Sequence, residues 1–395
     1  MSFISQVKNI ESAAADTGGP YRIMLVDDSA VIRGMLHRWL SSDPECKIVG
    51  SFFNGQQAVQ NVKSCDAEIV ILDIEMPEMD GLTALPKLIS LVPNIQVLMA
   101  STLTRRNADI SLRALSMGAV DYLPKPESAR SGTATADFRR DLLLKVKAIG
   151  AAFRKGRSGP AALRRPAVPG PGAAVPVHSA AKPVATENNA SKQIVLRTPS
   201  KYRPDILAIG SSTGGPQALF TLLGGLKNAL QVPVLITQHM PPTFTAILAE
   251  HIHNLTGITA REAVHGDVLR NGEVLIAPGN FHMTVARKGV DKIVQLDQNP
   301  QVNFCRPAVD PMFESISAVY GTTALAVVLT GMGHDGRDGG RKLVDAGGTL
   351  VAQDEKSSVV WGMPGAVAEA GLCSAVIALP EMALQIKRLL QGGAA

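Results

Sequence analysis

The chain has 395 residues, which is too many for one ordinary core and suits two domains. Hydrophobic residues make up 46% of it, yet no apolar run approaches the roughly 18 residues of a membrane span, and residues 1–19 lack the apolar core of a signal peptide. The four cysteines show no metal or disulfide spacing. We therefore expect a cytoplasmic protein with reduced thiols and no membrane insertion.

The net charge of +5 is concentrated in one segment. Residues 154–203 hold ten Lys or Arg against one acid, so they carry +9 and leave −4 for the remainder of the chain. Almost no aromatic residues stand among these basic residues to stack on bases. The charge therefore indicates a solvated linker, and we expect no nucleic-acid partner.

Strand and helix patterns alternate about five times in the first third of the chain. The expected strands cover 22–26, 47–52, 68–72, 95–100 and 120–123, and the first expected helices cover 30–41 and 55–62. This alternation predicts an α/β domain with a doubly wound parallel sheet and helices on both faces.

Polar side chains follow the strands of this predicted sheet: Asp27, Asp28, Asp73, Ser101 and Lys125. Ligands of parallel sheets bind beyond the carboxyl ends of the strands, so these side chains would share one pocket. Three crowded carboxylates need a cation, and a site of oxygen ligands suits Mg²⁺. We therefore predict Mg²⁺ binding by the three aspartates, and phosphorylation of Asp73 with Ser101 and Lys125 contacting the phosphoryl oxygens.

Three stretches here, LVDDS at 25–29, ILDIEMP at 71–77 and YLPKP at 122–126, resemble the response-regulator receiver domains of two-component signalling. The resemblance covers roughly residues 21–143. It implies a flavodoxin-like fold and phosphorylation of Asp73 by a histidine kinase. It also implies that Tyr122 is an aromatic switch whose rotamer responds to the phosphate.

A helical pattern over 138–153 is followed by a change of composition. Eight of the 25 prolines lie between residues 160 and 204, with Ala and Gly between them and no apolar periodicity. This composition predicts an extended, mobile linker. We therefore expect an N-terminal extension at 1–20, a receiver at 21–143, a helix end and linker at 144–201, and a second domain at 202–395.

The second domain opens with a strand, a glycine-rich turn and a helix over residues 205–225. Gly210, Ser212 and Gly214 have the G-x-S-x-G spacing of a nucleophile elbow, in which a strained turn exposes one hydroxyl beyond the sheet. Ser212 is therefore the candidate nucleophile. Glycine turns of this kind also hold phosphates or simply turn the chain, although the ATP-binding and dinucleotide-binding spacings are absent.

Two later strands, expected over 233–237 and 324–329, lead to His239 and Asp335. If these strands neighbour the one before Ser212, their ends bring a hydroxyl, an imidazole and a carboxylate together. In that arrangement the imidazole takes the serine proton and the carboxylate fixes its tautomer. The backbone amides of Thr213 and Met332 are the candidate oxyanion hole, because neighbouring glycines let N–H groups approach a reacting carbonyl.

Other residues compete for these parts. Four histidines lie in helix-like stretches or in the linker: His37, His178, His251 and His253. Three others are expected in turns and stay open as bases: His265, His282 and His334. Asp310 and Asp338 are the alternatives to Asp335, and the Gly-Met-Gly turn before Asp335 favours the latter.

Four stretches of this domain, at 210–215, 238–241, 306–310 and 329–336, resemble the catalytic domain of the chemotaxis protein-glutamate methylesterases, and 362–365 fits as well. The order of receiver, linker and esterase agrees with that family. The resemblance implies Ser-His-Asp catalysis by Ser212, His239 and Asp335. His334 departs from the family pattern, which often has asparagine there.

The resemblance implies hydrolysis of methylated glutamates on methyl-accepting chemoreceptors, with release of methanol, and deamidation of receptor glutamines. It implies no cofactor for ester hydrolysis, activation by a chemotaxis histidine kinase, and a receiver that covers the esterase site until Asp73 is phosphorylated. Two alternatives stay open. The second domain could be a binding module for a phosphate or nucleotide, or the enzyme could serve a chemosensory pathway other than chemotaxis.

Overall fold

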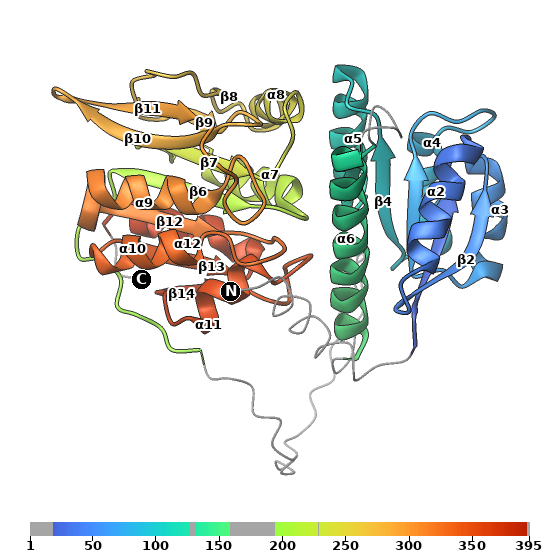
Figure 1. Ribbon diagram of the computed structural model, residues 1–395. Coiled ribbons are helices and arrows are strands. Elements are labelled where there is room, and N and C mark those ends of the chain that lie inside the picture. The colour runs from blue at the N-terminus through green and yellow to red at the C-terminus, as the bar shows by residue number, and fades with distance from the viewer. Residues whose placement is uncertain (1–18, 126–131, 159–193, 228, 393–395) are drawn as a thin grey trace, which may run out of the picture.

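Two parallel sheets, each covered by helices, organise the chain (Figure 1). The computed structural model describes residues 19–125, 132–158, 194–227 and 229–392. Most of the predicted linker and of the predicted N-terminal extension lie outside these residues. Within the described part of the chain, no helix is both long and apolar enough to cross a bilayer.

The first sheet has five parallel strands in the order β2-β1-β3-β4-β5. They are β1 (Tyr21–Val26), β2 (Cys46–Phe52), β3 (Ile69–Asp73), β4 (Gln96–Ser101) and β5 (Asp121–Pro124). The helices between them are α2 (Ala30–Ser41), α3 (Gly55–Cys65), α4 (Gly81–Leu91) and α5 (Arg105–Ser116). Every residue of β3 is buried, as expected where helices cover both faces of a parallel sheet.

Local sequence explains where these four helices begin. Each starts after a residue whose side-chain oxygen accepts a hydrogen bond from a backbone N–H of the first turn, namely Ser29, Asn54, Asp80 and Thr104. Such caps satisfy donors that a helix leaves unpaired at its start. The predicted strands and alternation are confirmed.

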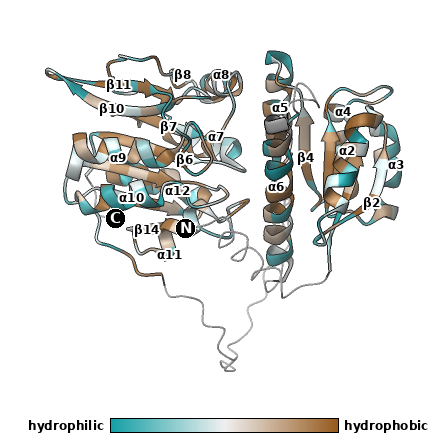
Figure 2. Ribbon diagram, in the orientation of Figure 1, coloured by the Kyte–Doolittle hydropathy of each residue, from teal (hydrophilic) through white to brown (hydrophobic). Residues whose placement is uncertain are grey.

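The last helix of the receiver, α6 (Gly132–Ser158), continues well past residue 143, where the sequence predicted the domain to end. Val146 and Ile149 are buried in the same core as Ile23. Near the C-terminal end of α6, the Arg154 guanidinium lies 2.7 Å from the carboxylate of Glu68. Figure 2 shows α6 with mixed apolar and polar residues, standing between the first sheet and the second domain.

This packing predicts that Ile149→Ala lowers the free energy of unfolding of the receiver. The side chain is 1% exposed, so its truncation leaves a cavity, and the expected loss is about 2–5 kcal/mol. Urea unfolding followed by circular dichroism measures it. A loss within experimental error would mean that residues 144–158 belong to the linker instead.

The second sheet has seven parallel strands in the order β14-β13-β12-β6-β7-β9-β8. They are β6 (Ile206–Ser211), β7 (Val234–Gln238), β8 (Ala260–Glu262), β9 (Val274–Ile276), β12 (Ala324–Val328), β13 (Thr349–Gln353) and β14 (Ala375–Ile377). The strand β6 therefore lies between β12 and β7. The predicted fold class of two α/β parallel-sheet domains is confirmed.

Helices cover both faces of this sheet. One core contains α7 (Gly215–Leu226), α8 (Phe244–Thr256) and α12 (Leu379–Leu390). The other contains α9 (Val309–Tyr320), α10 (Arg337–Asp345) and α11 (Met363–Glu369), and a short 3₁₀ turn, η2 (Gly321–Thr323), follows α9. Successive side chains of β6 alternate between them, with Ile206 and Ala208 in one core and Leu207 and Ile209 in the other.

An antiparallel hairpin of β10 (His282–Lys288) and β11 (Asp291–Asp297) was not predicted. Its first residue, His282, was expected in a turn and instead begins a strand. The imidazole is 2% exposed, its Nε2 lies 3.1 Å from the carbonyl of Pro300, and its Nδ1 accepts a hydrogen bond from the N–H of Ala308. Both ring nitrogens are thus bonded to backbone groups, which removes His282 as a candidate base.

The stretch before β6 also differs from the predicted linker. The N–H of Arg197 donates to the carbonyl of Cys373, and the N–H of Ser200 donates to the hydroxyl of Thr349. Ile194 packs against the core of the second domain. Residues 194–200 therefore lie against this domain.

Candidate active site

The sheet order brings together the residues that were predicted to react. β6 ends directly before Ser212 and β7 ends directly before His239, and the register pairs Ser211 with Gln238. On the other side, β12 pairs with β6 and continues through a loop to Asp335. Because parallel strands end at the same edge, the three side chains meet at one end of the sheet.

The turn after β6 accepts only very small residues. Gly214 has φ 75°, a conformation that side chains other than glycine rarely adopt, and a Cβ on Gly215 would lie 2.0 Å from Oε1 of Gln238. The amide of Gln238 donates to the carbonyl of Ser212 and so holds the turn against β7. The G-x-S-x-G spacing thus reflects close packing around Ser212.

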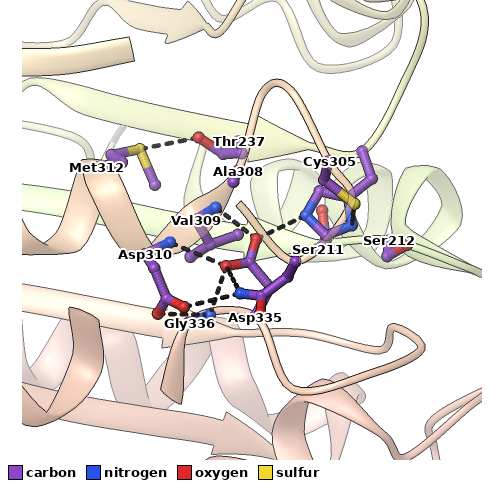
Figure 3. Close-up of polar contacts among 12 residues, drawn as sticks. Ser211, Ser212, Thr237, Cys305, Ala308, Val309, Asp310, Met312, Asp335 and Gly336 are labelled. Carbon is purple, nitrogen blue, oxygen red and sulfur yellow. Dashed lines mark hydrogen bonds and ion pairs between the residues drawn. The ribbon is translucent and has the colours of Figure 1, made fainter. Parts of the chain in front are cut away.

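The imidazole of His239 is held by the carboxylate of Asp335, with 2.8 Å between Nε2 and Oδ2. The other nitrogen, Nδ1, lies 3.3 Å from Sγ of Cys305. Within the described residues, no hydrogen bond joins Ser212 to His239. Figure 3 shows several donors meeting at the Asp335 carboxylate, with Cys305 and Ser212 beyond it.

Asp335 is 1% exposed and surrounded by donors. Its carboxylate accepts hydrogen bonds from the backbone N–H groups of Val309 at 2.6 Å, Asp310 at 3.1 Å and Gly336 at 3.0 Å, and from the amide of Asn303 at 3.0 Å. Burial alone would raise the pKa of Asp335, but the bonds to His239 and to backbone N–H groups lower it to about 2. Asp335 is therefore ionised at neutral pH.

The pKa of His239 responds to opposing influences. Burial lowers it, whereas Cys305 and the carboxylate of Asp335 raise it above the ordinary value. A carboxylate at 2.8 Å stabilises an imidazolium, which is what a general base must become during the reaction.

Asp310, an alternative to Asp335 in the sequence, has hydrogen-bond partners other than His239. Its Oδ1 accepts hydrogen bonds from Gly336 and Gly339, and its Oδ2 from the amide of Asn303. Burial and the charge of Asp335 raise the pKa of Asp310 to about 6. Asp310 therefore holds the start of α10 in place, and Asn303 bridges the two carboxylates.

Two of the remaining competitors lie away from His239, and the third is next to Asp335 in the sequence. His265 is exposed and bonds to the backbone of Leu296, and Asp338 is an exposed partner of Arg337. His334 is half-buried in the loop before Asp335.

Two backbone N–H groups near the turn after β6 are already hydrogen-bonded and cannot bind an oxyanion. The N–H of Ser212 donates to the carbonyl of Thr330, and the N–H of Gly331 donates to the carbonyl of Val360. Within the described residues, the backbone N–H groups of Thr213 and Met332 have no such partner. Thr213 is 2% exposed and Met332 is half-buried. These are the two amides that the sequence predicted as oxyanion donors.

A second cluster lies at the strand ends of the first sheet. One oxygen from each of Asp27, Asp28 and Asp73 lies within 4.8 Å of the others, and Nζ of Lys125 lies 2.7 Å from both Asp27 and Asp73. Ser101 is buried, with its hydroxyl 3.0 Å from that of Ser111. Three carboxylates without nitrogen or sulfur ligands fit Mg²⁺.

The two domains contact each other through α5, β5 and α6 of the receiver. The ring of Tyr122 stacks on that of Phe244 in α8, with 4.5 Å between centroids and 11° between planes. Asp109 of α5 lies 2.8 Å from Nε2 of His251, also in α8. Sequence reasoning named Tyr122 but had no signal for its partner.

The contact reaches the active site. Val360 is buried in the core that contains Phe138 and Leu142 of α6, and Met332 packs against the same cluster. The guanidinium of Arg140 lies 4.9 Å from the centroid of Phe304. The receiver therefore packs against the loops that carry the candidate oxyanion donor and Cys305.

A receiver sheet with an acidic cluster, joined to an α/β domain with serine, histidine and aspartate at its strand ends, defines a response regulator with a hydrolase-like output domain. The family model for the response regulator receiver domain matches residues 23–136, and that for CheB methylesterase matches residues 207–386. Both domains named from the sequence are confirmed.

Full-length relatives match nearly the whole chain. The protein-glutamate methylesterase/protein-glutamine glutaminase 1 of Paramagnetospirillum magneticum is 53% identical over 371 residues, covering 93% of this chain and 96% of the relative. That of Rhodospirillum rubrum is 51% identical, covering 96% and 97%. A relative from Rhodospirillum centenum, named for a group 2 operon, is 51% identical and covers 96% of each chain. The chain belongs to the protein-glutamate methylesterase/protein-glutamine glutaminase family.

The acidic cluster predicts that the affinity for Mg²⁺ decreases as the pH is lowered. Burial, opposed by Lys125 and assisted by Asp27, raises the pKa of Asp73 to about 6. Only the ionised carboxylate binds a metal, so lowering the pH from 7.5 to 5 should weaken binding roughly tenfold through Asp73. Isothermal titration calorimetry with Mg²⁺ measures this, and Asp73→Asn should show a smaller pH dependence. Equal pH dependence in both proteins would contradict the prediction.

Proposed function

We propose that this chain is a phosphorylation-controlled esterase that hydrolyses glutamate methyl esters on chemoreceptors and deamidates receptor glutamines. The observation that carries the proposal is the order β12-β6-β7: Ser212 and His239 directly follow adjacent strands, and Nε2 of His239 lies 2.8 Å from the carboxylate of Asp335. Membership of the methylesterase/glutaminase family supplies the substrate class. The cytoplasmic part of the receptors is then where the reaction takes place.

The reaction follows from the three side chains. Ser212 attacks the γ-carbonyl carbon of the methylated glutamate while its proton passes to Nδ1 of His239, and Asp335 stabilises the imidazolium through Nε2–H. The N–H groups of Thr213 and Met332 bind the oxyanion. The intermediate then expels methanol, which takes its proton from His239.

Water completes the cycle. It attacks the acyl group on Ser212, gives one proton to His239 and releases glutamate as the serine recovers its proton. A glutamine side chain presents the same carbonyl, with ammonia as the leaving group, so one set of residues serves both reactions. None of these reaction steps uses a metal ion.

Control begins at Asp73, which we propose accepts a phosphoryl group from a chemotaxis histidine kinase. Lys125, already 2.7 Å from Asp73, and the hydroxyl of Ser101 would contact the phosphoryl oxygens. Asp27, Asp28 and Asp73 would hold Mg²⁺, which neutralises the negative charge collected there when bound.

The signal then reaches the esterase through the domain contact. Tyr122 is 3% exposed and its ring is stacked on Phe244, so a change of its rotamer removes that contact. A phosphoryl group shifts the balance of docked and released states only by interacting differently with the two. Loss of the Tyr122 contact is the difference that we propose.

A second candidate keeps the enzyme and changes its pathway. The relative from Rhodospirillum centenum is named for a group 2 operon, which favours one of several chemosensory arrays as the source of receptors. The chemistry at Ser212 would be the same.

Ser212→Ala should abolish ester hydrolysis, because removing the nucleophile of such a triad costs up to ~10⁶ in kcat. The measurement is release of radiolabelled methanol from methylated receptor membranes, with and without a small phosphodonor. Ser211→Ala is the matched control, because it removes a neighbouring hydroxyl that only supports Gln238, and it should lower the rate far less than Ser212→Ala. Undiminished methanol release by Ser212→Ala would rule out Ser212 as the nucleophile. Absence of release from the wild type, with and without phosphodonor, would favour the binding module instead.

Removing the receiver should raise the basal rate. A fragment of residues 194–395 keeps the segment that packs on the second domain, so it should hydrolyse methyl ester faster than the unphosphorylated whole chain. Methanol release per molecule measures the difference, with the phosphodonor-treated whole chain as reference. Equal rates for fragment and untreated whole chain would remove the autoinhibition.

A further inference from the structure

A tight turn at Val302–Cys305 touches both the active site and the receiver. The N–H of Val302 donates to the carbonyl of Cys305, and the N–H of Cys305 donates back. Its two central residues have positive φ, 52° at Asn303 and 63° at Phe304. Such a conformation is tolerated by asparagine but is rare for a bulky aromatic residue, so the surroundings must hold Phe304 in it.

Two side chains of this turn point into the active site. The amide of Asn303 donates to Asp310 and Asp335, which fixes one end of the turn to the carboxylates. At the other end, Sγ of Cys305 lies 3.3 Å from Nδ1 of His239. Figure 3 shows Cys305 on the side of the site where Ser212 lies.

The position of this sulfur matters because of the orientation of His239. Nε2 is bonded to Asp335, so Nδ1 is the nitrogen that must accept the proton of Ser212. Whichever of the sulfur and the nitrogen carries the shared proton, the contact with Cys305 occupies Nδ1. Ser212 and Cys305 therefore compete for the same nitrogen.

The middle residue of the turn points to the receiver. The side chain of Phe304 is 54% exposed, and the guanidinium of Arg140 in α6 lies 4.9 Å from its ring centroid. This distance is that of a cation–π contact. The neighbouring Arg139 instead donates to Ser42 within the receiver.

We infer that the Val302–Cys305 turn withholds His239 from Ser212 while the receiver is docked, with Cys305 as the residue that occupies Nδ1. The cation–π contact with Arg140 fixes the ring of Phe304, and this keeps the turn in its conformation. The turn then keeps the sulfur of Cys305 next to Nδ1 of His239. Release of the receiver frees the turn, and the hydroxyl of Ser212 replaces the sulfur at Nδ1. This inference rests on the proposed roles of Ser212 and His239.

The test uses full-length protein and methanol release with and without phosphodonor. Cys305→Ala should raise the unphosphorylated rate about two- to tenfold, the worth of one hydrogen bond, and lower the activation ratio by the same factor. Arg140→Ala should raise the unphosphorylated rate about two- to fivefold. The double variant should not exceed Cys305→Ala, because both act on one contact. The matched control Arg139→Ala should leave the activation ratio unchanged.

Other results overturn the inference. An equal fall of both rates in Cys305→Ala would make the thiol a support for the active site, and two unchanged rates would mean that the thiol contributes packing alone. Ser212→Ala is assayed in parallel. If it stayed active while Cys305→Ala lost activity, the sulfur would be the nucleophile and the proposed function of Ser212 would fail as well.

Alkylation gives a second readout that does not depend on turnover. The rate at which iodoacetamide modifies Cys305, mapped by peptide mass spectrometry, should rise when phosphodonor is added, because the sulfur leaves the imidazole. Cys65, at the end of α3 in the receiver, is the internal reference and should keep its rate. A rate at Cys305 that does not respond to phosphodonor would contradict release of the turn.

Discussion

The buried carboxylate of Asp335 determines where the imidazole of His239 can lie. A charge with 1% exposure is stable only if donors surround it, and backbone N–H groups of three residues and the amide of Asn303 leave one direction for the imidazole. Because β12 and β7 flank β6, that direction leads to the end of β6, where the turn presents Ser212. The chemistry of the domain depends on this arrangement.

The same arrangement explains how a second domain can govern the reaction. Among the described residues, no hydrogen bond or ion pair joins the receiver to Asp335. It contacts the loops around it through α6 and stacks Tyr122 on Phe244. In the proposed mechanism, a phosphoryl group on Asp73 acts at a distance by weakening one shared surface, and the carboxylate of Asp335 need not move.

The strand ends were predictable because burial and glycine spacing mark them in the sequence, and these placed Ser212, His239 and Asp335. The positions of Asn303 and Cys305 in the site could not be predicted, because both lie in a loop whose path depends on packing and not on a periodic sequence pattern. The hairpin of β10 and β11 could have been predicted, because apolar and polar residues alternate on either side of Gly289, as is typical of paired strands. The helical pattern over 138–153 was predicted, but the packing of its second half on the receiver was not, because its buried residues face a core supplied by strands distant in the sequence.

The central claim is that His239, oriented by Asp335, activates the hydroxyl of Ser212 under control of the receiver. Incubation with a fluorophosphonate, followed by peptide mass spectrometry, tests it directly, because this reagent traps activated serines. The account predicts a single adduct on Ser212 that forms faster with phosphodonor and is lost in His239→Gln. Labelling that is absent from Ser212, or that forms at the same rate in His239→Gln, would contradict it.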